Sequence, residues 1–493
     1  MMNNIKLINN GLRKLSTLSV RSIRPDFKLV CSSLAFLNVL EREKLKNNGF
    51  IFSKLSNGLR VISKESESKI SKLGLFIRMG TRMESKNSLG ASRLLYDLTI
   101  NSKSKNGFGP SLIDKFNLNG AVLHGTQSKE LTSLFLEYLN GVEENNIEEF
   151  LDSIFRVHQF DFKDSEIENS KREVSKYFET RTNNIEELIH ELLHSTAWSK
   201  GALGNLQTHT TEQIMKIKRR NLEEYKNQYF SPENMIIFGI GVKHIDLLKK
   251  AMKYSEKSSI FGNKYEDIIN KDNITPSIYT GGMKTLYLKE PFTNITVALN
   301  TGFDWKSLDF VALSILQAHL GGGSSFSVGG PGKGMYSKLF LDVLNKFDWV
   351  ESCNCFINQF SDSGIFGIQV VSFPGFSFES LKTIALQFKN MRELTNEELS
   401  RAKNIVKGAV SMIYEDKNLL MEDIAMQILS HSEYITTEDL VSSIDKIESD
   451  DIKRVSEKIL SGIDRPTVIA VGSDINQLPE YHEIKNLLKQ AVT

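Results

Sequence analysis

The sequence predicts an α+β protein made of two homologous halves, because one succession of elements occurs twice along the chain. A charged helix over residues 219–229, an apolar segment at 231–241 and an amphipathic helix end the first half. The last part of the chain repeats this order with a helix over 450–460, a strand at 465–472 and a helix over 480–491. A Thr-Thr-Glu sequence precedes both series, which indicates two related units.

Each half also opens with apolar strands before its first helix. Residues 59–79 precede a helix expected over 90–100, and residues 285–301 precede a helix expected over 308–320. Strands hairpinned together and followed by helices on one face indicate α+β sandwich domains rather than a doubly wound sheet. At 493 residues the chain is too long for one core, and its 40% of hydrophobic residues suffice for more than one.

These patterns divide the chain into two domains joined by a polar segment. We expect an N-terminal domain at residues 45–255 and a C-terminal domain at residues 277–493. Residues 256–276 between them are rich in Lys, Asn and Asp, which is typical of a linker.

The first residues of the chain have the composition of a mitochondrial transit peptide. No acidic residue occurs before Asp26, and apolar residues are interspersed among basic ones. The apolar residues are too dispersed for the core of a secretory signal, so we expect a transit peptide over about residues 1–35, with a disordered basic tail as the alternative. The basic residues of this segment are Lys6, Arg13, Lys14, Arg21 and Arg24.

Charge and cysteine content exclude several classes of protein. The 61 basic and 60 acidic side chains give a net charge of +1, so no bulk field favours nucleic acid or anionic lipid. The chain has no uninterrupted apolar run of about 18 residues, which argues against a membrane span. Cys353 and Cys355 are separated by one residue of an expected strand, a poor geometry for a mutual disulfide, so the chain suits a reducing compartment.

The most unusual segment is a glycine-rich stretch between two apolar segments. It holds seven glycines, one proline and three serines, and it joins the apolar run 310–320 to residues 335–344, which have helical spacing. Glycine lets the backbone offer bare N–H and C=O groups, so we expect a binding loop rather than a flexible linker. Neither a Walker sequence nor a GxGxxG unit fits it, so it is not a phosphate cradle. The predicted substrate-binding residues are Gly321, Gly322, Gly323, Ser324, Ser325, Phe326, Ser327, Val328, Gly329, Gly330, Pro331, Gly332, Lys333 and Gly334.

A literal His-Glu-x-x-His sequence occurs at His190, Glu191 and His194. In zinc proteases this spacing places two histidines one helical turn apart with a glutamate base between them. The apolar positions of the same helix lie on the other side of the helical wheel, so we expect both histidines on a solvated face. Glu212 follows 18 residues after His194 as a possible third ligand, but a glycine-containing break lies between them. We interpret the sequence as a structural helix and keep a zinc site as the alternative.

Several motifs together resemble the pitrilysin-like (M16) metallopeptidase family over about residues 50–490. They are the glycine-rich stretch followed by Met-Tyr-Ser-Lys-Leu-Phe at 335–340, Ser-Asn-Gly-Leu-Arg-Val at 56–61, the segment 193–204 and Ser-Pro-Glu-Asn-Met at 231–235. The resemblance implies two halves of α/β sandwich (M16/LuxS-like) domains packed around a central cavity. The glycine-rich stretch departs from the family where Ser324 stands, because members often have a fourth glycine there.

Catalytic members of this family carry His-x-x-Glu-His on the first helix, with two histidines for zinc and a glutamate that activates water. By the resemblance, Arg93, Tyr96 and Asp97 occupy those positions here. Arg93 is always protonated and has no lone pair for a metal, so we expect no catalytic zinc and no cofactor on this chain.

The resemblance therefore implies a non-catalytic subunit of a mitochondrial matrix peptidase. Such a subunit binds the presequences of imported precursors through its glycine-rich loop, while a β partner supplies the zinc and the catalysis. One alternative is a structural core subunit of the inner-membrane cytochrome bc1 complex, which shares the fold. The other is a self-sufficient zinc protease that uses residues 190–194.

Overall fold

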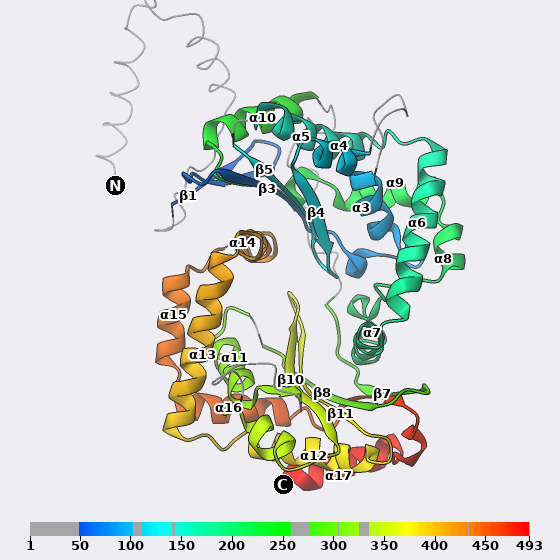
Figure 1. Ribbon diagram of the computed structural model, residues 1–493, viewed down its shortest axis with the longest axis vertical. Coiled ribbons are helices and arrows are strands. Elements are labelled where there is room, and N and C mark those ends of the chain that lie inside the picture. Colours follow the sequence, from blue (N-terminus) through cyan, green and yellow to red (C-terminus); the bar gives the residue numbers. More distant parts are fainter. Residues whose placement is uncertain are drawn as a thin grey trace, which may run out of the picture.

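The computed structural model contains two six-stranded sheets, one above the other in Figure 1, each with helices packed on its outer face. It describes residues 49–101, 111–140, 143–257, 276–303, 305–324, 335–431 and 433–492. The expected transit peptide, most of the expected linker and residues 325–334 of the glycine-rich stretch lie outside these ranges. In the described part, no helix is long and apolar enough to cross a membrane.

The N-terminal sheet has the strand order β1-β2-β6-β3-β5-β4. Its strands β2 and β6 are parallel, and the other neighbours are antiparallel. The strands are β1 (Phe50–Lys54), β2 (Arg60–Lys64), β3 (Ile70–Ile77), β4 (Val122–Gln127), β5 (Thr132–Leu139) and β6 (Met235–Ile240).

The C-terminal sheet has the order β7-β12-β8-β11-β10-β9. Here β7 and β12 form the parallel pair, and the other neighbours are antiparallel. The strands are β7 (Gly282–Tyr287), β8 (Thr293–Asn300), β9 (Gly322–Ser324), β10 (Val350–Gln359), β11 (Gly364–Ser372) and β12 (Thr467–Gly472).

Five strands of each sheet share one order, β2-β6-β3-β5-β4 and β7-β12-β8-β11-β10, while β1 extends the first sheet at one edge and β9 extends the second at the opposite edge. The shared order confirms the prediction of two homologous halves. In each, the last strand of the half returns to lie between two strands from its beginning, β6 between β2 and β3, and β12 between β7 and β8. The expectation that these opening strands pair directly as a hairpin is therefore wrong. The physical reason is that β6 and β12 are buried at every position, and a strand apolar on both faces belongs in the interior of a sheet.

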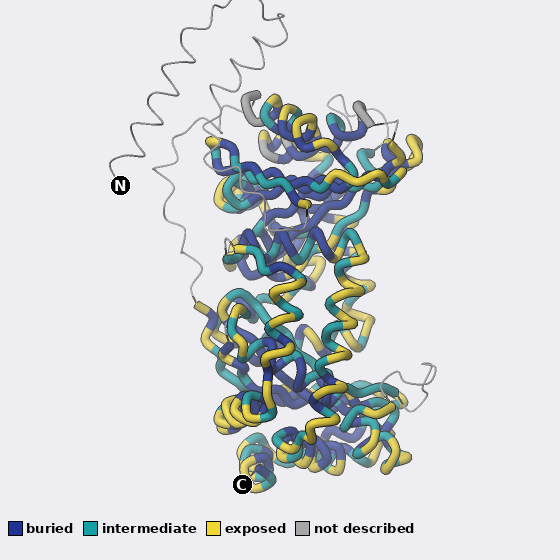
Figure 2. The backbone as a smooth tube through the Cα atoms, turned by 90° about the vertical axis from the view of Figure 1, so that its left-hand side faces the viewer, coloured by how far each residue is buried: buried dark blue, intermediate teal, exposed yellow. Residues whose placement is uncertain are grey.

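Most helices of each half pack against one hydrophobic core on the outer face of its sheet, and α7 and α14 are the exceptions. The helices of the N-terminal half are α3 (Ala91–Asn101), α4 (Leu112–Leu118), α5 (Glu143–Gln159), α6 (Asp164–Thr182), α7 (Ile185–Ala197), α8 (Thr211–Lys216), α9 (Arg219–Tyr229) and α10 (His244–Lys257), with short 3-10 helices η1 (Thr81–Met83), η2 (Ala202–Gly204) and η3 (Pro232–Asn234). Those of the C-terminal half are α11 (Leu308–Leu320), α12 (Ser377–Asn390), α13 (Asn396–Glu415), α14 (Lys417–His431), α15 (Thr437–Lys446), α16 (Ser449–Leu460) and α17 (Tyr481–Val492), with the π-helix η6 (Phe340–Leu344) and the 3-10 helix η7 (Ile475–Gln477). Figure 2 shows the buried residues gathered at the two sheets and the exposed ones mainly on the helices.

Two helices cross between the halves and cover the inner faces of the sheets. Helix α14 of the C-terminal half packs with Met421 and Ile424 against Phe76 and Phe238 of the N-terminal sheet. Helix α7 of the N-terminal half packs against the C-terminal sheet. Each half therefore donates one helix to the other, and Figure 1 shows α14 under the upper sheet and α7 over the lower one.

Candidate functional site

The positions that resemble the family's zinc motif lie on α3, whose first turn is fixed by a buried carboxylate. Glu84 accepts hydrogen bonds from the backbone N–H groups of Gly90 and Ser92, each at 2.9 Å. Gly90 has φ +89°, and a Cβ there would lie 2.4 Å from Ile214 Cδ1, so the entry to α3 requires glycine. This anchoring sets which way Arg93, Tyr96 and Asp97 point.

Arg93 lies between two aromatic rings. Its guanidinium carbon is 3.8 Å from the ring centroid of Tyr177 on α6 and 4.5 Å from that of Tyr96. A guanidinium so close to ring faces is held by cation–π attraction. The side chain fills this place as a permanent cation and offers no lone pair to a metal.

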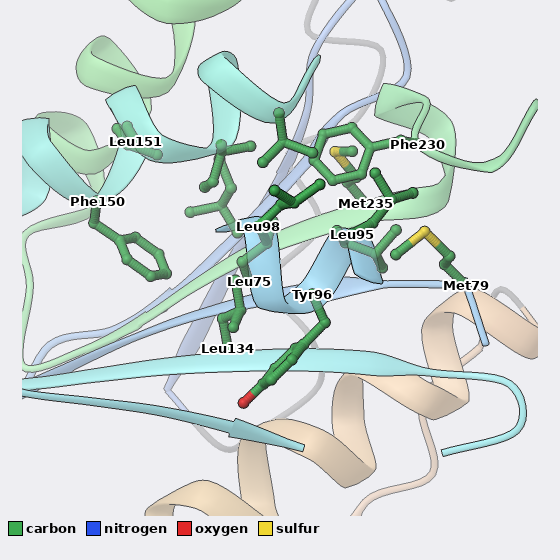
Figure 3. Close-up of a cluster of buried hydrophobic side chains, with 14 of the residues drawn as sticks. Leu75, Met79, Leu95, Tyr96, Leu98, Leu134, Phe150, Leu151, Phe230 and Met235 are labelled. Atoms are coloured by element: carbon green, nitrogen blue, oxygen red, sulfur yellow. The ribbon is translucent and has the colours of Figure 1, made fainter. Parts of the chain in front are cut away.

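Tyr96 and Asp97 are engaged by neighbours of their own. The Tyr96 hydroxyl donates to the carbonyl oxygen of Gly125 at 3.0 Å, and Figure 3 shows the ring extending from α3 toward the sheet. Burial raises the pKa of Tyr96, so its phenol stays neutral. Asp97 accepts from Asn101 Nδ2 at 2.7 Å, and burial raises its pKa. The three positions thus provide one carboxylate and no imidazole, which is not a donor set for catalytic zinc.

The His-Glu-x-x-His sequence lies on α7, and the expectation that both histidines lie on a solvated face is confirmed for His190 and wrong for His194. His190 is exposed, but Glu191 and His194 are only 8% and 9% exposed. The His194 ring stacks on Trp198 with centroids 5.7 Å apart, and its Nε2 is 3.2 Å from Asn358 Nδ2. The helical wheel failed because α7 is covered on its polar side by the β10–β11 hairpin of the other half.

These contacts leave no group on α7 arranged for metal catalysis. The backbone N–H of Gln207 lies 3.0 and 2.9 Å from the two carboxylate oxygens of Glu191, so that carboxylate holds a loop. Burial lowers the pKa of His194 well below its usual range. Glu212, the candidate third ligand, pairs with Lys216 at 2.6 Å on the exposed side of α8. Within the described ranges, no group of three or more His, Cys, Asp and Glu could hold a metal ion.

We expect the isolated chain to bind zinc far below one ion per chain, because neither helix presents a complete donor set. The measurement is metal analysis after dialysis against a weak chelator, made on the wild type and on His190→Ala. Both should give the same low content. A content near one zinc per chain that disappears in His190→Ala would instead support the protease alternative.

The described start of the glycine-rich stretch is a turn and an edge strand. Gly321 ends α11 with φ +60° and donates its N–H to Gln317 O at 2.7 Å. Residues 322–324 then form β9, which pairs with Ser352–Asn354 of β10 at the edge of the sheet. Gly322 has φ +138°, and a Cβ there would lie 2.3 Å from Cys353 O, whereas a Cβ on Gly323 would meet only Leu344 Cδ1 at 4.0 Å. The backbone geometry therefore requires glycine at positions 321 and 322 but not at position 323.

A groove of about 960 Å³ lies beside this turn, between α11, α13 and β10. Its wall on α13 includes Ile405 and Met412, which are 51% and 66% exposed. His319 at the end of α11 also lines the groove, and burial lowers its pKa to about 4, so it is neutral at physiological pH. Our sequence analysis missed this groove, although the apolar residues at helical spacing on α13 could have indicated an uncovered face.

Sequence comparison identifies the family. A model described as insulinase (peptidase family M16) matches residues 60–211, and one described as peptidase M16 inactive domain matches residues 216–406. The chain therefore belongs to the peptidase family M16.

Within this family the chain is similar to α subunits of mitochondrial-processing peptidases. The human mitochondrial-processing peptidase subunit alpha is 28% identical over 451 residues, which cover 88% of this chain and 84% of that protein. The probable subunit alpha of Schizosaccharomyces pombe is 27% identical over 472 residues, covering 89% of this chain and 88% of that protein. Among solved structures, a chain of complex III2 from Candida albicans, bound to Inz-5, superposes with a TM-score of 0.73 at 19% sequence identity. The superposition covers 89% of this chain and 99% of that chain. That likeness shows the fold.

Proposed function

We propose that this chain is the non-catalytic, presequence-binding α subunit of a mitochondrial processing peptidase in the matrix. The observation that carries the proposal is Arg93, a permanent cation packed between Tyr96 and Tyr177 where the family's catalytic members have a zinc-binding histidine. The curated relatives and the acid-free N-terminal composition support the mitochondrial setting. A β partner would supply zinc, whose bound water attacks the scissile carbonyl.

In this proposal, the role of the chain is to hold the presequence in an extended conformation. Strand β9 is the edge strand of the C-terminal sheet, so one side of it faces no other strand in the described structure. An edge strand presents N–H and C=O groups that can pair with an extended peptide whatever its side chains. The groove beside it could take up apolar side chains of the same peptide. Such a surface suits substrates that share composition rather than sequence.

The experiment is cleavage of a fluorescent presequence peptide by the mature chain alone, and by the chain mixed with a His-x-x-Glu-His-bearing β partner. We expect cleavage only in the mixture. Gly322→Ala should lower kcat/KM about tenfold, because a left-handed backbone and a clash with Cys353 O cost about 1–3 kcal/mol at the start of the loop. Gly323→Ala is the matched control and should be nearly neutral.

Other outcomes would reject the proposal. Cleavage by the chain alone, lost in Glu191→Gln, would establish the zinc protease. Absence of cleavage in every mixture would favour a structural role such as that of a cytochrome bc1 core subunit, for which the complex III likeness at 19% identity shows only a shared fold.

A further inference from the structure

Helix α13 has an apolar face that the described residues leave uncovered. Ile405, Gly408, Ala409 and Met412 are exposed and line the groove between α11, α13 and β10. They recur at intervals of three and four residues, so they share one side of the helix over about 10 Å. A Cβ built on Gly408 would meet no atom within 4 Å, so the middle of this face is open. An exposed apolar face that borders a groove favours the docking of another apolar segment.

The floor of the groove carries a second, independent sign of an occupant. His319 lines the groove and is only 6% exposed, yet its Nε2 has no hydrogen-bond partner within the described ranges. The Oγ of Ser337, which also lines the groove, has no partner there either. Buried polar atoms are nearly always hydrogen-bonded. These two atoms therefore indicate an occupant that brings a polar group into the apolar groove.

A segment with this pattern precedes the described fold. Residues 34–40 have the sequence Leu-Ala-Phe-Leu-Asn-Val-Leu, six apolar residues and one asparagine, and they lie outside the described ranges. A helix of seven residues spans about 10 Å, the length of the apolar face of α13. The Asn38 amide has donors and an acceptor, so it can pair with the Nε2 of His319 in either tautomer. A transit peptide that ends near residue 35 would leave Phe36 and Leu40 on the mature chain.

The chain between this segment and the fold is long enough to reach the groove. Residues 41–48 separate it from Gly49, where the described chain begins, and eight residues span at most roughly 26–29 Å. Phe50 belongs to the cluster under the N-terminal sheet against which Tyr414, at the end of α13, packs. Figure 1 shows β1 on the same side of the molecule as α14 and α13. So short a tether gives an effective concentration on the order of mM, which favours this segment over a separate partner or a second copy.

We propose that residues 34–40 of this chain dock in the groove between α11 and α13. Their apolar side chains would cover Ile405 and Met412, and the Asn38 amide would pair with His319. The groove lies beside the glycine-rich stretch, so the docked segment would compete with the apolar side chains of a bound peptide. This competition rests on the proposed function, whereas the docking itself does not.

The test is hydrogen–deuterium exchange of the full chain, followed by mass spectrometry of the fragments that contain residues 34–40. Docking should slow the exchange of these amides at least about tenfold relative to a free peptide of the same sequence. Met412→Asp places a charge on the apolar face of α13 and should abolish this protection. Ser411→Asp is the matched control, because it adds the same charge at an exposed position of α13 that does not line the groove. It should keep the protection.

The reciprocal variant changes the segment itself. Phe36→Asp/Leu40→Asp should also lose the protection. In fluorescence anisotropy with the mature chain, it should raise the affinity for a fluorescent presequence peptide about tenfold, because a groove occupied for about nine-tenths of the time weakens apparent binding by that factor. Its control, Asn47→Asp/Asn48→Asp, adds the same two charges to the tether and should change neither result.

Exchange of residues 34–40 at the rate of the free peptide would overturn the docking, as would protection that survives in Met412→Asp. Protection that falls on dilution would overturn it too, since the segment would then dock on a second copy. An unchanged peptide affinity in Phe36→Asp/Leu40→Asp, with the protection lost, would overturn the competition. Met412 is 66% exposed, and a thermal melt of each variant checks the fold. Neither cleavage nor a β partner enters the exchange measurement, so its failure is distinguishable from failure of the proposed function.

Discussion

Replacing Arg82 with alanine should lower the free energy of unfolding by about 3–5 kcal/mol, the cost typical of removing one partner from a buried ion pair. The Arg82 side chain is fully buried. It pairs with Glu130 of its own half and with Asp362 of the other, and it donates to Ser361 Oγ at 3.0 Å. Without it, Glu130 at 3% exposure would keep a buried charge with no cation beside it.

Urea denaturation followed by circular dichroism measures this effect. Arg220→Ala is the matched control, because Arg220 makes an exposed ion pair with Glu224 on α9 and should leave the midpoint unchanged. Adding Glu130→Gln to Arg82→Ala should recover part of the loss, since it removes the uncompensated carboxylate. If Arg82→Ala and Arg220→Ala had the same urea midpoint, the ion pairs of Arg82 with Glu130 and Asp362 would not hold the two halves together.

Sequence patterns predicted correctly those helices whose ends are fixed by capping residues next to them in the sequence. The helix expected at 308–320 is α11, which begins after Ser307, whose hydroxyl accepts from the N–H of Phe310, and ends at Gly321 with its positive φ. The helix expected at 219–229 is α9 with the same bounds. By contrast, only residues 338–344 of the helical pattern at 335–344 are helical, and residues 340–344 of them form a π-helix.

Contacts between distant residues could not be predicted in the same way. The pattern of α7 shows an apolar face, but it does not show that Asn358, 164 residues away, approaches the polar face. The apolar sequences of β6 and β12 likewise indicate that these strands are buried, but they do not indicate which strands lie on either side of them. At the zinc-motif positions, residue type alone sufficed to exclude a metal, because no packing gives Arg93 a lone pair.

Replacing Trp198 with alanine should also destabilise the protein by about 3–5 kcal/mol, the usual cost of emptying the site of a large buried aromatic side chain. Trp198 is fully buried at the end of α7. It lies in one cluster with Ile365 and Ile469 of the C-terminal sheet, and its Nε1–H donates to Ser363 Oγ at 3.0 Å. The indole therefore anchors a helix of one half on the sheet of the other.

Trp198→Phe separates the two contributions of this side chain. It keeps an aromatic ring in the cluster and loses the hydrogen bond to Ser363, so we expect a smaller loss of about 0.5–1.5 kcal/mol in addition to the cost of the smaller ring. Because the donated helix gives the C-terminal sheet its inner cover, Trp198→Ala should also make the amides of β12 exchange faster with deuterium than in the wild type. Unchanged exchange in β12 together with an unchanged midpoint would mean that the packing of α7 contributes little, and that each half is stable without the helix it receives.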